Sequence, residues 1–294
     1  MSGFFRGIKG IRIYRNRPLA RYTSLGIGGP ADYLVVVNSR RGLGKVLTVI
    51  QRRRLRKFVI GCGTNLLASD RGFRGVVIKL AGGFRRIQNR GDLFICGAAV
   101  TCSALAEYAR QRGYGGAEFM FGIPGTIGGG VKGNAGAWGE NMAGIVTRAW
   151  IVDRHFREQS RSRTAIRFSY RHSGIADDEI ITAVEFRLTR RDPRLIRRTM
   201  ADHLRRRSQR QPPGRSAGSF FKNPPQRPAG QIIEECGLKG RRVGDAQVSL
   251  QHANFIINRG RARSSDVRAL VQIIKRTVRR TTGIRLQEEV RSLP

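Results

Sequence analysis

The stretch from Gly122 to Gly139 constrains the fold of this chain more than any other feature, because eight of its eighteen residues are glycine. Glycine loses more backbone freedom on ordering than any other residue, so the stretch predicts neither an ordinary helix nor an ordinary strand. A long glycine loop instead lets the backbone approach a flat ligand closely, with Asn134 able to hydrogen-bond and Trp138 able to stack. A purely structural hinge is the alternative interpretation.

Strand-like and helix-like segments alternate on both sides of this loop, which indicates an α/β or α+β protein. Apolar runs predict strands at 32–37, 58–60, 76–78, 93–96, 149–153, 180–188, 254–258 and 284–290. Apolar residues at helical spacing predict helices at 43–50, 103–112, 195–207 and 265–282. We expect three domains, at 1–81, 82–190 and 191–294.

Three details of these elements can be compared with a structure. Ser103 is the expected N-cap of its helix, and Gly113 and Gly283 are the expected stop signals of theirs. The helix at 195–207 is expected to turn Ile196, Met200, His203 and Leu204 inward. The segment 211–228 is expected to be a loop.

The charge of the chain is unusual, since 56 Lys and Arg against 20 Asp and Glu give +36. Such a surface attracts phosphates of any kind, including nucleic acid. The arginines are scattered rather than gathered in one tail, which favours compositional bias. We therefore expect nucleic-acid binding only as a non-specific charge effect.

Several protein classes are not expected from this sequence. No apolar run reaches the ~20 residues that a membrane helix needs, so no membrane insertion is expected. The start of the chain lacks the pattern of a signal peptide, which makes the cytoplasm the expected location. The four Cys and four His show no metal-ligand spacing, so no metal is expected.

The first motif that could carry chemistry is the segment Gly61-Cys-Gly-Thr-Asn-Leu-Leu-Ala-Ser-Asp, which directly follows a predicted strand. Two glycines without Cβ let backbone N–H groups converge on an anion, a nest suited to a pyrophosphate. The segment is neither a Rossmann fingerprint nor a Walker A loop, because it lacks the third glycine of the one and the Gly-Lys-Ser/Thr of the other. A tight turn remains the alternative.

A second motif, Ser216-Ala-Gly-Ser-Phe-Phe-Lys-Asn-Pro, places a hydroxyl, an ammonium and an amide close together. Ser219 is followed by two phenylalanines that could shield it from water. No Asp–His pair of the hydrolase kind lies nearby, so Ser219 is better suited to giving a proton than to attacking. Taken alone, this residue could equally be a turn serine, and Arg171 and Glu289 could each be solvated charges.

Taken together in this order, these segments resemble the UDP-N-acetylenolpyruvoylglucosamine reductase (MurB) family. The similarity runs from Thr23-Ser-Leu-Gly-Ile-Gly-Gly-Pro-Ala-Asp to Glu289-Val-Arg and includes Gly240-Arg-Arg-Val-Gly-Asp and His252-Ala-Asn-Phe. The resemblance implies an α+β protein with an FAD-binding fold of the vanillyl-alcohol-oxidase (PCMH) type. In that fold two α/β subdomains clasp FAD and a C-terminal α+β domain binds substrate.

The resemblance also implies an oxidoreductase of peptidoglycan precursor synthesis. NADPH would reduce FAD, and the UDP-sugar substrate UDP-N-acetylglucosamine enolpyruvate would become UDP-N-acetylmuramate. No sequence segment marks a separate NADPH site, and a monomer is expected. The form without the extra substrate-capping tyrosine loop is expected from the short link between Arg171 and Ser219.

Site residues follow from the matched positions. The resemblance implies that Arg171, Ser219 and Glu289 are catalytic, and that Lys222 and Asn223 hold substrate. It implies an FAD site formed by Gly61, Gly63, Thr64, Asn65, Ile123, Pro124, Gly125, Gly128, Asn134 and Gly136. The chain departs from the family pattern at Thr64, Trp138 and Asp245, and in its arginine content.

Two other functions remain to be tested against this one. An oxidase or dehydrogenase on the same FAD scaffold would lack a use for Ser219, Arg171 and Glu289 together. A basic nucleic-acid-binding protein would be expected to carry a recognition motif, and the sequence shows only charge.

Overall fold

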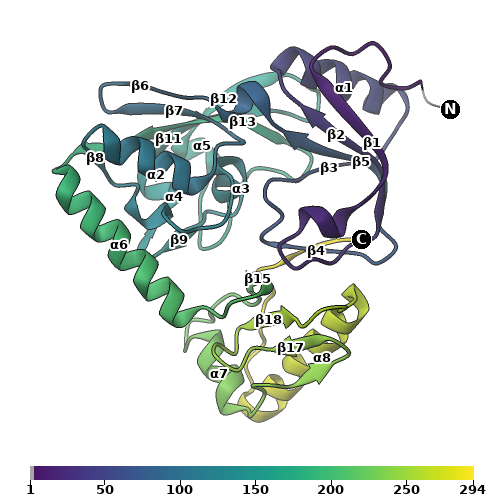
Figure 1. Ribbon diagram of the computed structural model, residues 1–294, viewed down its shortest axis with the longest axis vertical. Helices are drawn as coiled ribbons and strands as arrows, with labels where there is room; N and C mark the ends of the chain where they lie inside the picture. Colours follow the sequence, from purple (N-terminus) through teal and green to yellow (C-terminus); the bar gives the residue numbers. More distant parts are fainter. Residues whose placement is uncertain (1–2) are drawn as a thin grey trace. The chain divides into compact units, whose positions relative to one another are not determined.

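The computed structural model describes residues 3–294, which form two compact units (Figure 1). Unit 1 contains the N-terminal segment as far as Arg15, then Tyr33–Gly61 and Gly75–Arg206. Unit 2 contains Asn16–Asp32, Cys62–Arg74 and Arg207–Pro294. The division of the chain into three contiguous domains stays a prediction.

Most of one mixed sheet lies in unit 1, with strand order β1-β2-β5-β3. Its strands are β1 (Ile11–Pro18), β2 (Pro30–Val37), β3 (Lys57–Val59) and β5 (Phe73–Leu80). Helix α1 (Arg40–Arg52) connects β2 to β3, and β3 pairs with β5 in parallel. The apolar stripe predicted for α1 is buried, and Ser39 caps the helix by accepting from the Gly42 N–H at 3.1 Å.

The second sheet of unit 1 is antiparallel, with strand order β12-β11-β13-β7-β6. Its strands are β6 (Ile87–Arg90), β7 (Leu93–Gly97), β11 (Val146–Val152), β12 (Glu158–Ser162) and β13 (Ile180–Arg187). The helices of this region are α2 (Cys102–Gln111), α3 (Ile127–Lys132), α4 (Met142–Ile145) and α5 (Arg163–Ile166). Side chains from both sheets join one apolar core that includes Phe94, Phe119 and Phe186.

Two short strand pairs complete unit 1: β8 (Tyr114–Gly115) with β14 (Thr189–Arg190), and β9 (Gly136–Ala137) with β10 (Glu140–Asn141). Helix α6 (Pro193–Arg210) buries Ile196, Met200 and His203 as predicted. The prediction for Leu204 was wrong, since this side chain is 46% exposed. At 100° per residue Leu204 lies at the edge of the stripe that the other three define.

Unit 2 contains an antiparallel sheet with strand order β15-β18-β17-β16. Its strands are β15 (Arg215–Ser219), β16 (Arg242–Val243), β17 (Ala246–Val248) and β18 (Phe255–Asn258). Helices α7 (Ala229–Glu235) and α8 (Ser264–Thr282) share its apolar core, and β4 (Leu66–Ala68) pairs in parallel with β19 (Arg291–Leu293). Among residues 3–294, the 3₁₀ helices are η1 (Leu19–Tyr22), η2 (Gly82–Arg85) and η3 (Glu118–Met120).

Four further predictions about elements were wrong. The glycine-rich stretch does contain a helix, α3, whose N-terminus is capped by Thr126. The expected loop at 211–228 contains β15, and the last strand lies at 291–293 rather than 284–290. Thr101 rather than Ser103 caps α2, because its hydroxyl accepts from the Ala104 N–H at 3.2 Å.

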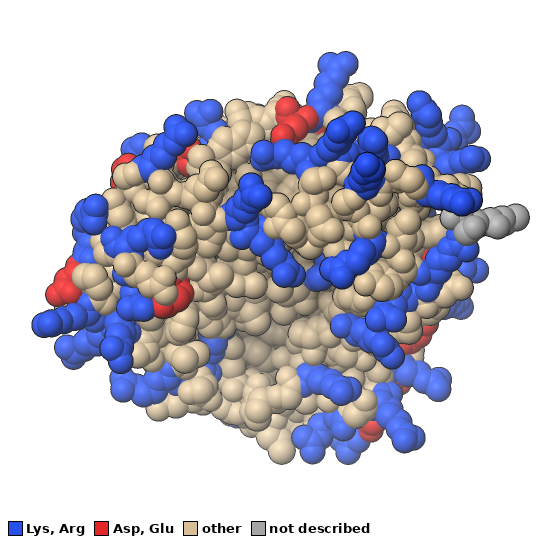
Figure 2. All heavy atoms as spheres, turned by 45° about the horizontal axis from the view of Figure 1, so that its top comes forward, with Lys and Arg blue, Asp and Glu red and all other residues tan. Residues whose placement is uncertain are grey.

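Figure 2 shows Lys and Arg side chains scattered over the visible face, with few acidic groups between them. This scattering matches the distribution of arginine along the sequence. Within residues 3–294, no helix combines the length and apolar character needed to span a bilayer. In the same range, no three His, Cys, Asp or Glu residues form a group that could hold a metal ion.

Candidate active site

The predicted site residues are divided between the two units. Ser219, Glu289, Lys222 and Asn223 belong to unit 2, together with the segment 63–65. Arg171, Gly61 and the predicted cofactor residues between 123 and 136 belong to unit 1.

Ser219 is the last residue of β15, where the strand departs from regular pairing. The register with β18 shifts between Ser216 and Ser219, and Ser219 pairs with Phe255. Gly218 adopts φ +78°, a left-handed conformation that residues with a Cβ rarely take. The strand ends at this irregularity. Ser219 is half-buried there, and the residue that follows it, Phe220, is buried.

The two residues after Ser219 are fixed by Asn254, whose side chain is 3% exposed. Its carbonyl oxygen accepts from the Phe220 N–H at 2.7 Å. Its side-chain amide pairs both polar groups of Phe221, accepting from N–H at 2.9 Å and donating to C=O at 2.8 Å. The sequence predicted this asparagine only as the start of a strand and as part of the resemblance, because its role depends on a contact across 33 residues.

Glu289 lies on the segment that runs antiparallel to Phe220–Lys222. The Glu289 N–H donates to the Phe220 carbonyl at 2.8 Å, and the Lys222 N–H donates to the Gln287 carbonyl at 2.9 Å. The Glu289 carbonyl in turn accepts from the side-chain amide of Asn65 at 3.1 Å. Unit 2 therefore brings three predicted site residues, Ser219, Glu289 and Asn65, onto neighbouring segments.

The two predicted substrate residues differ in their surroundings. Lys222 is half-buried, whereas Asn223 is exposed. The side-chain oxygen of Asn223 accepts from the Ala229 N–H at 3.0 Å, at the first residue of α7. Asn223 thus provides a hydrogen-bond acceptor for a backbone N–H at the start of α7. The sequence did not reveal this local role.

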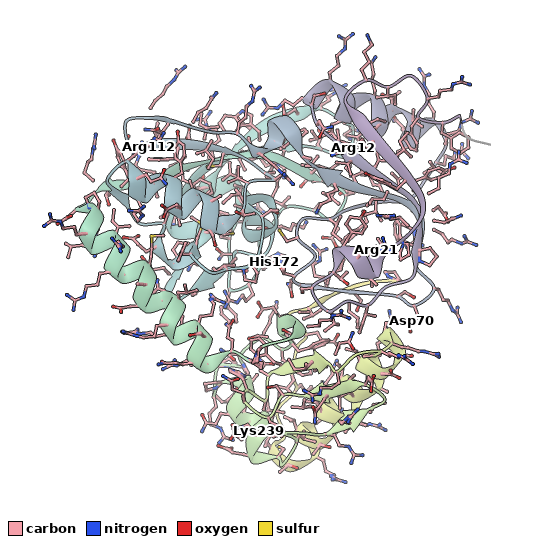
Figure 3. All side chains as sticks on the ribbon, viewed as in Figure 1. Arg12, Arg21, Asp70, Arg112, His172 and Lys239 are labelled. Atoms are coloured by element: carbon pink, nitrogen blue, oxygen red, sulfur yellow. The ribbon has the colours of Figure 1, made fainter. Side chains whose placement is uncertain are left out.

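Arg171 stands at the corner of a tight turn in unit 1, with φ +52°. The backbones of Ser169 and His172 exchange hydrogen bonds of 3.0 and 3.1 Å across this turn. The guanidinium Nη1 of Arg171 donates to the Gly136 carbonyl at 3.1 Å, which fixes the direction of the side chain. Figure 3 labels the neighbouring His172.

Asn134 connects the glycine-rich stretch to the turn that carries Arg171. It is 6% exposed and has φ +44°. Its side-chain amide donates to the Ser169 carbonyl at 2.9 Å, and its side-chain oxygen accepts from the Ala143 N–H at 3.0 Å. A predicted FAD residue therefore also positions a predicted catalytic one.

Two glycines of the first predicted cofactor loop, Gly61 and Gly63, are required by close packing. A Cβ on Gly63 would lie 1.9 Å from the Tyr22 carbonyl oxygen. A Cβ on Gly61 would lie 2.6 Å from the Thr126 hydroxyl oxygen. Neither Gly61–Asn65 nor Gly122–Gly136 contains a carboxylate, so the loops offer backbone N–H, hydroxyl and amide groups. This donor set fits an anionic diphosphate such as that of FAD.

Fold and donor set together define an FAD-binding protein, and comparison with known proteins agrees. Residues 31–153 match the model of an FAD binding domain. Residues 209–293 match that of the UDP-N-acetylenolpyruvoylglucosamine reductase C-terminal domain.

Individual relatives are similar over nearly their whole length. UDP-N-acetylenolpyruvoylglucosamine reductase 2 of Symbiobacterium thermophilum is 44% identical over 95% of this chain and 92% of the relative. The UDP-N-acetylenolpyruvoylglucosamine reductase of Geobacter metallireducens is 42% identical over 95% of this chain and 93% of the relative. The crystal structure of the Thermus caldophilus enzyme (MurB) aligns with a TM-score of 0.85 at 37% identity, covering 97% of this chain and all of that one.

The chain belongs to the UDP-N-acetylenolpyruvoylglucosamine reductase (MurB) family. The predicted recognition, fold class and FAD cofactor are thereby confirmed. The roles of individual site residues stay predictions.

Proposed function

We propose that this chain reduces UDP-N-acetylglucosamine enolpyruvate to UDP-N-acetylmuramate, with FAD as cofactor and NADPH as electron source. Family membership across 95% of the chain is the observation that carries the proposal. The neighbouring positions of Ser219 and Glu289 in unit 2, and the fixed guanidinium of Arg171 in unit 1, support the assignment of roles.

FAD, when bound and reduced, supplies the hydride that the reaction consumes. Hydride addition to the outer carbon of the enol ether leaves negative charge on the inner carbon and its carboxylate. Arg171 stabilises this charge, because a guanidinium aimed at the developing anion lowers the barrier. In its protonated form, Glu289 would donate a hydrogen bond to the same carboxylate.

Ser219 then gives a proton to the inner carbon. A serine hydroxyl is a weak acid, so this transfer needs a strongly basic carbon and tight geometry. The hydrogen bonds that Asn254 makes to Phe220 and Phe221 provide such restraint on the segment that follows Ser219. The proton-donor role therefore agrees with the local rigidity of the site.

The proposed FAD site is formed by Thr64, Asn65 and the glycine loops. The proposed substrate contacts are made by Lys222 and Asn223. A cytoplasmic monomer of the type without the extra tyrosine loop is proposed as well. Size-exclusion chromatography with light scattering would give the oligomeric state.

The positive charge of the chain is proposed to speed capture of the anionic substrate, so kcat/KM should fall as the salt concentration is raised.

The test separates the two half-reactions in anaerobic stopped-flow experiments. NADPH should bleach the yellow protein, and the enolpyruvyl substrate should restore the colour. Ser219→Ala should leave reduction by NADPH nearly intact and slow reoxidation by substrate by at least about 100-fold, the contribution expected of a general acid. Ser216→Ala, the same change on the same strand, is the control and should leave both steps unchanged.

Other outcomes would contradict parts of the proposal. Equal losses in both half-reactions would remove Ser219 from the role of proton donor. Oxygen consumption driven by an alcohol or sugar, without turnover of the enolpyruvyl substrate, would indicate an oxidase on the same scaffold. Colourless protein that cannot be reconstituted with FAD would end the assignment. DNA binding that persists at about 200 mM salt would point to nucleic acid instead.

A further inference from the structure

The β9–β10 hairpin has a tryptophan where its turn demands a left-handed backbone. Ala137 pairs with Glu140, so Trp138 and Gly139 form a two-residue connection. Their φ values are +59° and +87°, as a type I′ turn requires at both positions. Asn and Gly adopt this conformation readily, whereas a bulky side chain is strained there. Such strain persists only where the surroundings hold the residue in place.

The indole of Trp138 is held by His203 on α6. The two rings stack with centroids 5.5 Å apart and planes 21° apart. The indole N–H is buried and has no hydrogen-bond acceptor among residues 3–294, so no polar contact within that range fixes the ring. The stack therefore helps to offset the strain of the turn, together with the packing of Trp138 against the apolar core of unit 1.

The ring of His203 is held by a contact with the backbone of Glu118. It is 8% exposed, and its Nδ1 lies 3.3 Å from the Glu118 carbonyl oxygen. The buried Glu118 side chain accepts from the Gly116 N–H at 2.5 Å and forms an ion pair with Arg191 at 2.9 Å. The histidine therefore presents a rigid surface to the indole.

The hairpin leads directly to the guanidinium that the proposed reaction uses. Gly136 pairs with Asn141 at the open end of the hairpin, and its carbonyl accepts the Arg171 Nη1 hydrogen bond. A Cβ at position 136 would lie 2.4 Å from the Glu140 carbonyl oxygen, so the two strands are closely packed. A hairpin that shifts will move the acceptor that orients Arg171.

We propose that Trp138 and His203 are positioning residues for Arg171. The stack holds the hairpin, the hairpin holds the Gly136 carbonyl, and that carbonyl directs the guanidinium. All these groups lie in unit 1. The inference rests on the proposed function, in which Arg171 binds the substrate carboxylate.

The experiment compares His203→Ala, His203→Phe, Trp138→Asn and Arg171→Ala in the holoenzyme. Trp138→Asn keeps a residue suited to the turn but removes the ring, and His203→Phe keeps a ring for the stack. Two readouts are taken: the half-reaction rates, and the affinity for UDP-N-acetylmuramate by isothermal titration calorimetry. Met200→Ala, buried one turn earlier on α6, is the control for destabilisation.

His203→Ala and Trp138→Asn should each slow substrate-driven reoxidation and weaken product binding by about tenfold, the upper range for one aromatic pair. Both should leave reduction by NADPH unchanged, and His203→Phe should restore most of the loss. Met200→Ala should lower stability without separating the two half-reactions.

The failures are distinguishable. If Arg171→Ala leaves reoxidation and binding unchanged, the proposed role of Arg171 is wrong. If Arg171→Ala is defective while His203→Ala and Trp138→Asn resemble the wild type, only the positioning inference falls. Equal losses in both half-reactions for His203→Ala would also overturn it, since that result indicates a general structural role.

Discussion

Removing the side-chain amide of Asn254 should lower the free energy of unfolding more than an Asn→Ala substitution at a less buried position. In Asn254→Ala, the backbone N–H and C=O of Phe221 lose the partners found at 2.9 and 2.8 Å. Phe221 is 1% exposed, so water does not replace these partners without a rearrangement. Each unsatisfied buried group costs about 1–3 kcal/mol, which gives a loss of about 2–6 kcal/mol.

Two further variants separate hydrogen bonding from cavity formation. Asn254→Leu fills the space but still leaves both backbone groups unpaired, so it should lose most of the same free energy. Asn89→Ala removes two long hydrogen bonds of a half-buried side chain, one donated to the Gly91 carbonyl and one accepted from the Tyr108 hydroxyl, both at 3.4 Å, and should cost about 1 kcal/mol or less.

Guanidinium unfolding of the holoenzyme at fixed FAD concentration, followed by far-UV circular dichroism, gives these differences. A loss below about 1 kcal/mol for Asn254→Leu would refute the assignment of the cost to unpaired backbone groups. Because Ser219 lies two residues before Phe221, Asn254→Ala should also slow substrate-driven reoxidation more than reduction by NADPH. Equal slowing would mean that the amide does not position the serine.

Three other predictions each follow from the surroundings of one residue. Burial raises the pKa of Asp70 (Figure 3), but hydrogen bonds from the backbone at the start of α8 outweigh it and leave the pKa below its usual value. The melting-temperature advantage of wild type over Asp70→Asn should therefore be full at neutral pH and vanish once the pH falls below that lowered pKa; an advantage unaffected by acid would contradict this. Gly63→Ala should reduce the FAD content of purified protein, because its Cβ would lie 1.9 Å from the Tyr22 carbonyl oxygen; undiminished flavin absorbance would count against it. Burial raises the pKa of the Cys96 thiol far above its usual value, so native protein at pH 8 should leave it unlabelled by a thiol reagent while the half-buried Cys236 reacts. Peptide mass spectrometry would show the order, and faster labelling of Cys96 would contradict the prediction.

The sequence predicted best those elements whose pattern is local. The stripe from Val267 to Val278 and the stop at Gly283 predicted α8, because helical spacing and a left-handed C-terminal residue are read within a few turns. Gly113, with φ +73°, ends α2 in the same way. These signals need no knowledge of distant residues.

Two of the wrong predictions, the loop at 211–228 and the absence of a helix in the glycine-rich stretch, share a physical cause, since each depended on packing against another segment. Ser219 belongs to a strand rather than a loop because β15 pairs with β18, which lies far along the chain. Helix α3 forms despite its glycines, with Ile127 and Val131 buried in the core, and the packing leaves no room for a side chain at Gly130, whose Cβ would lie 2.5 Å from the Met142 methyl carbon. Tertiary contact thus outweighed local propensity.

By itself, the sequence determined the family, the cofactor and the residue types that the chemistry needs, because these are carried by motifs of a few residues each. Only the tertiary structure decided how those residues are held: Asn254 against Phe221, Asn134 against Ser169, and Trp138 against His203. Each of these contacts joins residues more than thirty positions apart. Short-range periodicity carries no information about such pairs, because they exist only once the chain has closed its loops.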